Sequence, residues 1–135
     1  MTYNVNDENF KNSEIYKNFL KEYPSRGGLR VRAYAASGAI PISGLKVEIS
    51  TMFNGDKIIF FEGETDESGL IERVSLPTPE LSTDNLESPL KKTYDILTTY
   101  ENVDTTYKVD MYEGVCVLQN VNVVPAMMVG GFFGS

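Results

Sequence analysis

The sequence predicts an all-β protein, a seven-stranded Greek-key-type β-sandwich, over most of its length. From Gly28 onward, short runs rich in β-branched and aromatic residues are separated by Gly, Pro, Asn and Asp. These turn clusters recur at roughly the 8–12-residue spacing that is typical of a sandwich or barrel. A chain of 135 residues has room for one such domain.

The first strand is the run 29–35, in which apolar and polar residues alternate strictly. Leu29, Val31 and Ala33 fall on one face, and Arg30, Arg32 and Tyr34 fall on the other. This pattern predicts a half-buried strand. The remaining strands are expected over 45–50, 57–64, 70–76, 93–100, 105–112 and 115–124.

Two tight turns divide the central strands. Asn54 and Gly55 both tolerate the positive φ of a type I′ hairpin turn. Asp66 can accept backbone N–H bonds, and Gly69 can take a left-handed conformation. The proline-rich segment Pro77 to Lys92 predicts a long surface crossover instead of a strand.

The two ends lie outside this pattern, which divides the chain into an arm (1–26), a sandwich (27–125) and a tail (126–135). Residues 8–22 show helical spacing, with Pro24 as a stop. The apolar face of this helix packs either on its own domain or on a neighbouring subunit. The tail is apolar and glycine-rich, so either another surface covers it or it frays. We predict a subunit interface formed by Ile15, Tyr16, Phe19, Leu20, Met127, Met128, Val129, Phe132 and Phe133.

Composition argues against several functions. The net charge of −7, without a cluster of Lys or Arg, is unfavourable for nucleic-acid binding. No apolar run is long enough for a membrane span, and no secretory signal is expected from the polar, acidic first residues. Cys116 is the only cysteine, and we expect it to be buried and inert.

The sequence contains few candidates for catalytic or metal-binding residues. The chain has no histidine, which removes the usual proton relay of Ser or Cys hydrolases and a common zinc ligand. Paired carboxylates, Asp66 with Glu67 or Glu62 with Glu64, are better explained as surface charge than as a glycosidase pair. Loop oxygens of Asp66, Glu67 and Asp84 offer a weak calcium alternative. We therefore expect a protein that is not an enzyme and has no cofactor or metal.

Residues 28–124 resemble the transthyretin-like, or carboxypeptidase-regulatory-like, sandwich that also underlies CnaB-type domains. The opening strand from Gly28, the turn around Pro41 and Gly44, and the Asp66–Gly69 turn carry this likeness. The same turns are more closely similar to the accessory β-domain of clostridial spore-cortex-lytic enzymes. The resemblance implies a module that supports or attaches other parts.

CnaB-type domains also imply a Lys–Asn isopeptide bond beside a buried acid. Arg30 and Arg32 occupy the first strand here, where that pattern requires a lysine. Lys46, Asn120, Asn122 and Glu72 are the residues left to form such a bond, so we do not expect one.

The function expected from the sequence is that of a structural subunit. We expect an extracellular or spore-surface assembly, a filament in which terminal arms dock on neighbouring copies, with a spore, cell wall or virion as a further scaffold. A virion or phage-tail decoration protein is one alternative. A glycan-binding module that uses Tyr34, Tyr100, Tyr107 and Tyr112 is the other.

Overall fold

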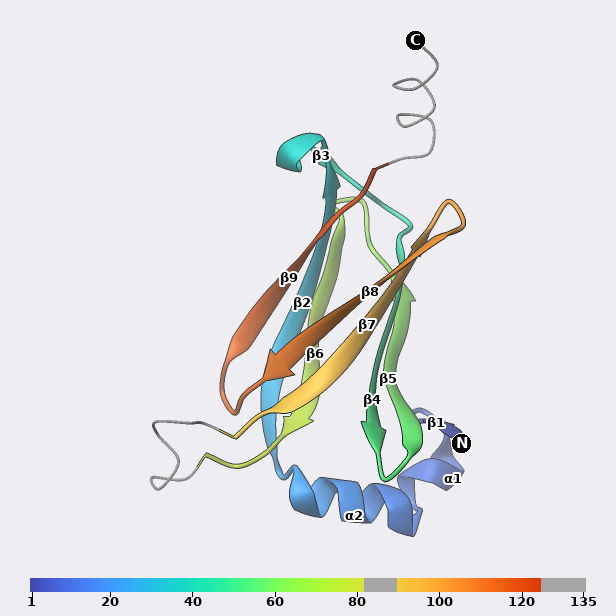
Figure 1. Cartoon of the computed structure of the whole chain (residues 1–135), viewed down its shortest axis with the longest axis vertical. Helices are drawn as coiled ribbons and strands as arrows, with labels where there is room; N and C mark the ends of the chain where they lie inside the picture. The colour runs from blue at the N-terminus through green and yellow to red at the C-terminus, as the bar shows by residue number, and fades with distance from the viewer. Residues whose placement is uncertain (82–89, 125–135) are drawn as a thin grey trace.

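The computed structural model describes residues 1–81 and 90–124. Two short helices precede a body made of strands (Figure 1). The elements in chain order are β1 (Thr2–Asn4), α1 (Glu8–Lys11), α2 (Glu14–Glu22), β2 (Ser25–Ala35), η1 (Ala36–Gly38), β3 (Ile40–Pro41), β4 (Lys46–Phe53), β5 (Asp56–Glu64), β6 (Leu70–Thr78), β7 (Lys92–Tyr100), β8 (Val103–Met111) and β9 (Cys116–Asn122).

The strands form two sheets. The five-stranded sheet has the order β1-β5-β4-β7-β8, and we call it the lysine sheet because lysines are its only basic residues. The second sheet has the order β3-β2-β6, with β9 also paired to β2, and we call it the arginine sheet because arginines are its only basic residues. β9 runs parallel to β2, whereas β6 runs antiparallel to it. The predicted sandwich is confirmed, with nine strands in the described part of the chain where the sequence pattern indicated seven.

The core fills the space between the two sheets. Alternate residues of the paired strands are buried there, including Leu29, Val31, Ile49 and Ile96, each at 0% exposure. Tyr94 is also fully buried, and its hydroxyl donates to the carbonyl of Pro77 at 2.6 Å. A buried Tyr requires such a partner because an unpaired hydroxyl would cost about 1–3 kcal/mol.

The turns follow the chemistry of their residues. Asn54 and Gly55 both adopt positive φ, as the predicted hairpin requires. The Asp66 carboxylate accepts from Ser68 N at 2.9 Å and from Leu70 N at 3.0 Å. Gly69 has φ +76°, and a Cβ there would collide with the carbonyl oxygen of Ala33. Only glycine meets both conditions at this position.

The N-terminal segment packs on its own domain, which is one of the two alternatives that the sequence left open. A second apolar cluster joins Phe10 and Phe19 of the helices to Phe53 and Ile58 of β4 and β5. The expected helix is divided at Ser13, whose side chain caps α2 by accepting from Tyr16 N at 3.2 Å. In Figure 1, α2 crosses one end of the sandwich.

β1, which the sequence pattern missed, extends the lysine sheet. Its three residues pair in parallel with β5, from Thr2 opposite Lys57 to Asn4 opposite Ile59. The amino group of Met1 also lies 3.2 Å from the Asp56 carboxylate. The arm is therefore attached to the body by backbone pairing as well as by its apolar side chains.

Candidate functional site

One side of the sandwich is open at the strands β8 and β9. Within residues 1–81 and 90–124, β8 pairs only with β7, and β9 pairs only with β2. Both strands border the same side of the body in Figure 1. Each strand therefore presents a row of unpaired backbone groups, which is a template for adding another strand.

The two edges differ in how they are protected. β8 carries Asp104, Lys108 and Asp110, and charged side chains of this kind discourage pairing with another chain. β9 has the sequence CVLQNVN and carries no charge. The edge of β9 is thus the less protected of the two.

The direction of the backbone groups of β9 follows from two hydrogen bonds. Val123 N donates to Tyr34 O at 2.8 Å, and Val115 O accepts from Gly28 N at 2.9 Å, so odd-numbered residues face β2. Because successive residues of a strand point their N–H and C=O groups to opposite sides, Leu118 and Asn120 direct theirs to the open edge. Both side chains are exposed.

A small cavity of about 60 Å³ lies between the two edges, at the end where β9 finishes. Tyr100, Tyr107 and Val103 line it from the lysine sheet, and Val121 and Val123 line it from the arginine sheet. Val103 and Val124 at its rim are each 59% exposed. This end of the open side therefore presents apolar surface to whatever approaches it.

We did not predict this edge from the sequence, although the apolar residues that mark it are visible there. Apolar residues exposed on the open side include Val103, Leu118 and Val124, by 59%, 47% and 59%. The run 115–124 was identified as a strand, but nothing local showed that only one of its edges would be paired. The predicted interface residues of the tail, Met127, Met128, Val129, Phe132 and Phe133, lie outside the described residues.

The predicted interface residues of the arm are brought together against the body. Phe19 is fully buried, with its ring 5.2 Å from that of Phe53 and 5.6 Å from that of Phe60. Ile15, Tyr16 and Leu20 pack around the same cluster and are half-buried. A contact between these residues and a neighbouring copy stays a prediction.

Lys92 secures the end of α2. Its Nζ atom lies 4.9 Å from the centre of the Tyr23 ring and 5.9 Å from that of Phe19, and it donates to Met52 O at 2.8 Å. Burial lowers the pKa of Lys92, because the charged form loses water. The ring faces and the carbonyl partly replace that water.

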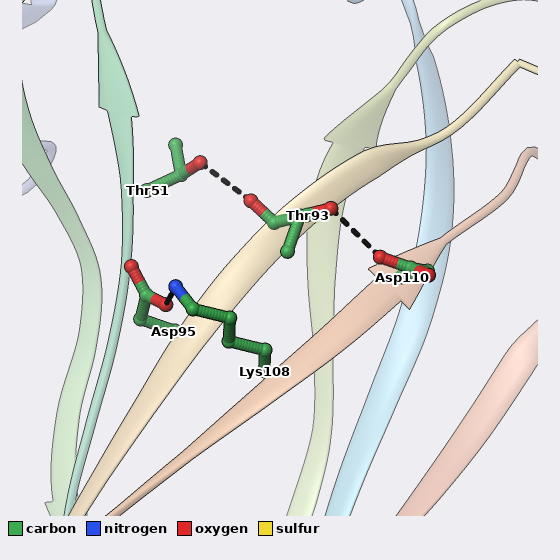
Figure 2. Close-up of polar contacts among 5 residues, drawn as sticks. All are labelled: Thr51, Thr93, Asp95, Lys108 and Asp110. Atoms are coloured by element: carbon green, nitrogen blue, oxygen red, sulfur yellow. Dashed lines mark hydrogen bonds and ion pairs between the residues drawn. The ribbon is translucent and has the colours of Figure 1, made fainter.

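The lysine sheet carries ordered polar pairs, whose members lie on its outer face except for the buried Thr51. Figure 2 shows Thr93 between two partners: its carbonyl accepts from Thr51 Oγ1, and its hydroxyl donates to Asp110, each at 2.7 Å. Lys108 lies 2.7 Å from Asp95 in the same view. The bond from Thr93, followed by that from Lys91, lowers the pKa of Asp110.

Two shallow grooves of about 430 and 330 Å³ lie on that outer face and share Glu48 and Leu97. The larger groove also contains Glu62 and Glu64, one of the carboxylate pairs considered from the sequence. The other pair, Asp66 and Glu67, lies in the β5–β6 turn, where Asp66 serves the backbone. Among the described residues, no three His, Cys, Asp or Glu side chains are placed to hold a metal ion, and Asp84 lies outside that range.

Cys116 is exposed, so the prediction of a buried cysteine is wrong. It begins β9, where Val117, Gln119 and Val121 turn towards the interior and the residues between them turn outwards. Cys116 has the outward parity. Cysteine is typically buried in proteins, but the register of β9 places this side chain on the outside.

The residues considered for an isopeptide bond do not meet. Lys46 is exposed on the outer face of the lysine sheet, and Asn120 and Asn122 are exposed on β9 of the other sheet. The four tyrosines considered for glycan binding are all half-buried. Tyr34 lies beneath Arg32, whose guanidinium carbon is 5.0 Å from its ring centre.

No family model and no curated protein matches the chain. Solved structures do. The chain is similar to 5-hydroxyisourate hydrolase from Klebsiella pneumoniae, with 18% identity, a TM-score of 0.46, and coverage of 73% of this chain and 91% of the other.

Two further structures are similar to the chain. Transthyretin from Sparus aurata is 15% identical, with a TM-score of 0.43 and coverage of 70% and 90% of the two chains. The dioxygenase domain of a dioxygenase carbohydrate-binding protein fusion from Streptomyces sp. SirexAA-E is 6% identical, with a TM-score of 0.47 and coverage of 74% and 81%. The strand pairing of the chain itself makes it a β-sandwich, and transthyretin is among the structures to which it is similar.

Enzymes are among these structures, and this contradicts the prediction that the chain is not an enzyme. The prediction relied on the absence of histidine and on the resemblance to non-catalytic modules. One of these proteins is a hydrolase, and another is a dioxygenase domain. The fold therefore gives no ground for excluding catalysis.

No helix in the described ranges is long and apolar enough to cross a membrane.

Proposed function

We propose that this protein is a structural subunit that assembles with copies of itself by strand addition at β9. The unprotected edge of β9 is the observation that carries this proposal. It is paired on one side only, carries no charge, and directs the backbone groups of Leu118 and Asn120 outwards. Added strands of this kind gain backbone hydrogen bonds and bury apolar side chains at the same time.

The proposed donor is the tail, residues 126–135. Its ten residues include two methionines, a valine and two phenylalanines. An extended strand rises about 3.3 Å per residue, so the tail spans about 33 Å at most, enough to lie along a strand of seven residues such as β9. Donation from each copy to the next is a head-to-tail contact that does not close, and it produces a filament.

Spore-surface placement and kinship with the accessory domain of spore-cortex-lytic enzymes belong to the same proposal. They rest on the turn motifs of the sequence, and a virion or phage-tail lattice would use the edge in the same way. The physical step is common to these settings: an apolar segment leaves water by completing a sheet of another molecule.

A proline substitution tests the edge directly. Asn120→Pro removes an N–H that points away from β2, so we expect the monomer to fold and the added strand to lose a hydrogen bond and be blocked sterically. Asn120→Ser keeps the N–H and serves as the matched control. Negative-stain electron microscopy and light scattering should show polymers for the intact chain and Asn120→Ser.

Monomers are expected for Asn120→Pro and for a chain ending at residue 124. Melting temperatures close to that of the intact chain would show that both variants are folded. An intact chain that stays monodisperse at high concentration would overturn the proposal. So would polymers that form equally well after Asn120→Pro.

A further inference from the structure

The charges of the sandwich are divided between its two sheets. All four arginines of the chain lie in the arginine sheet: Arg26, Arg30 and Arg32 on β2, and Arg73 on β6. Glu72 is the only carboxylate on the strands of that sheet. The strands of the lysine sheet carry seven carboxylates and four lysines. In an acidic protein, one sheet is therefore cationic and the other anionic.

The arginines form a continuous row on the outer face. Arg26, Arg30 and Arg32 share the outward parity of β2, with Gly28 between the first two. The side chain of Arg73 lies over that gap, so close to Gly28 that a Cβ there would collide with its Nε atom. Alternate residues of a strand lie about 7 Å apart, so the row presents closely spaced guanidinium groups.

These guanidinium groups have few partners. Arg26 donates to Ser75 O at 3.3 Å, and Arg32 donates to Gly38 O at 3.5 Å. Both acceptors are neutral backbone carbonyls. In the described part of the chain, all ion pairs of side chains involve lysine, and none involves an arginine. The row thus keeps its positive charge and most of its donors.

The outer face of the lysine sheet is complementary to this row. Lys57 neutralises Glu48 at 2.6 Å, and Lys108 neutralises Asp95 at 2.7 Å. Glu62 and Glu64 have no ion-pair partner among the described residues, and both line the larger groove, which has Leu97 in its wall. Exposed Leu118 lies opposite Arg30 on the arginine sheet. Lys46 also lines this groove, opposite Glu64, and Asn4 Nδ2 donates to Glu62 at 2.7 Å. The groove thus keeps an excess of negative charge, and each face combines an excess of charge of one sign with an apolar side chain.

We infer that the arginine face of one copy docks on the Glu62–Glu64 groove of the next copy. The inference rests on the proposed self-assembly and adds a second contact to it. Because the two surfaces are different parts of the same molecule, the contact is head-to-tail and extends without closing. Charge complementarity sets the register of such a contact and suppresses wrong partners.

Charge reversal on each face tests this contact in the full-length chain. Arg30→Glu with Arg73→Glu reverses the arginine face, and Glu62→Lys with Glu64→Lys reverses the groove. All four side chains are exposed, so the fold should survive. We expect each pair alone to raise the concentration for half-assembly about tenfold or more, through lost attraction and new repulsion.

The chain that carries all four changes is the decisive variant. Its faces are complementary again with exchanged signs, so its assembly should return to within about threefold of the unchanged protein. Lys17→Glu with Lys21→Glu on α2 matches the charge change of the arginine pair and should leave assembly unaffected. Raising salt from about 0.1 M to 1 M, which shortens the screening length from about 10 Å to about 3 Å, should weaken the face contact.

The outcomes separate this inference from the proposed function. Polymers whose assembly is unmoved by either reversal, but lost after Asn120→Pro, would leave strand addition intact and overturn the face contact. The face contact would also be overturned if the four-change variant assembles no better than the variants in which only one face is reversed. If the protein binds polyphosphate through Arg30, and the four-change variant does not recover assembly, the arginine face would be assigned to an anionic polymer instead. A monodisperse intact chain would overturn both proposals.

Discussion

The removal of Phe19 is the clearest test of whether the N-terminal arm belongs to the folded domain. Its side chain is fully buried between α2 and the body, against Phe53 and Phe60. Phe→Ala changes at such sites cost about 3–5 kcal/mol, because the transfer energy of the ring is lost and a cavity remains. The aromatic pairs place Phe19→Ala in that range, at about 4 kcal/mol.

This loss is large beside the total stability of a small domain, about 5–15 kcal/mol. With a urea slope of about 2 kcal/mol/M, the midpoint of unfolding should fall by about 2 M. Lys17→Ala lies on the same helix at an exposed position and should change the stability by less than about 0.5 kcal/mol. If Phe19→Ala lowers the urea midpoint by less than about 0.5 M, the arm is not packed on its own domain, and the reasoning is refuted.

Three other predictions follow from single positions. Gly69→Ala should destabilise by more than about 2 kcal/mol because of both the positive φ and the collision with Ala33 O, whereas Gly55→Ala, with positive φ but open space, should cost about 1 kcal/mol in the same urea titration. Asp110 has a lowered pKa in the folded state, so it stabilises the protein above the unfolded value of about 3.9, and this contribution disappears as the pH falls through the folded pKa. The stability difference between the unchanged protein and Asp110→Asn should therefore be present at pH 7 and vanish in strong acid; a constant difference would contradict the assignment. Cys116 should react with a thiol reagent in the native protein as fast as in urea, and protection in the native state would contradict its exposure.

The strands of the body follow from local patterns in the sequence. Alternation at Leu29, Val31 and Ala33 identified β2 because a half-buried strand must turn every second side chain to the core. Asn54–Gly55 and Asp66–Gly69 marked their turns because few residues tolerate positive φ or accept local N–H bonds. These signals act within a few residues, so they can be read without knowing the rest of the chain.

The candidate edge and the charged faces depend on contacts between distant segments. The pattern of 115–124 indicated a strand, but its pairing with β2 on one side only is set by residues far away in the chain. The exposure of Cys116 depends on the same register. Likewise, the side chain of Arg73 reaches the row of β2 only because Gly28 has no Cβ to collide with it.

The sequence by itself determined the fold class, the positions of the main strands and the chemistry of the two central turns. The tertiary structure alone decided that the arm packs against its own body, that β9 keeps an unprotected edge, and that arginines and lysines occupy different sheets. The physical reason is the distance along the chain over which each kind of interaction acts. Backbone preferences and side-chain alternation act between neighbours, whereas pairing, burial and the meeting of charges depend on which distant segments share a surface.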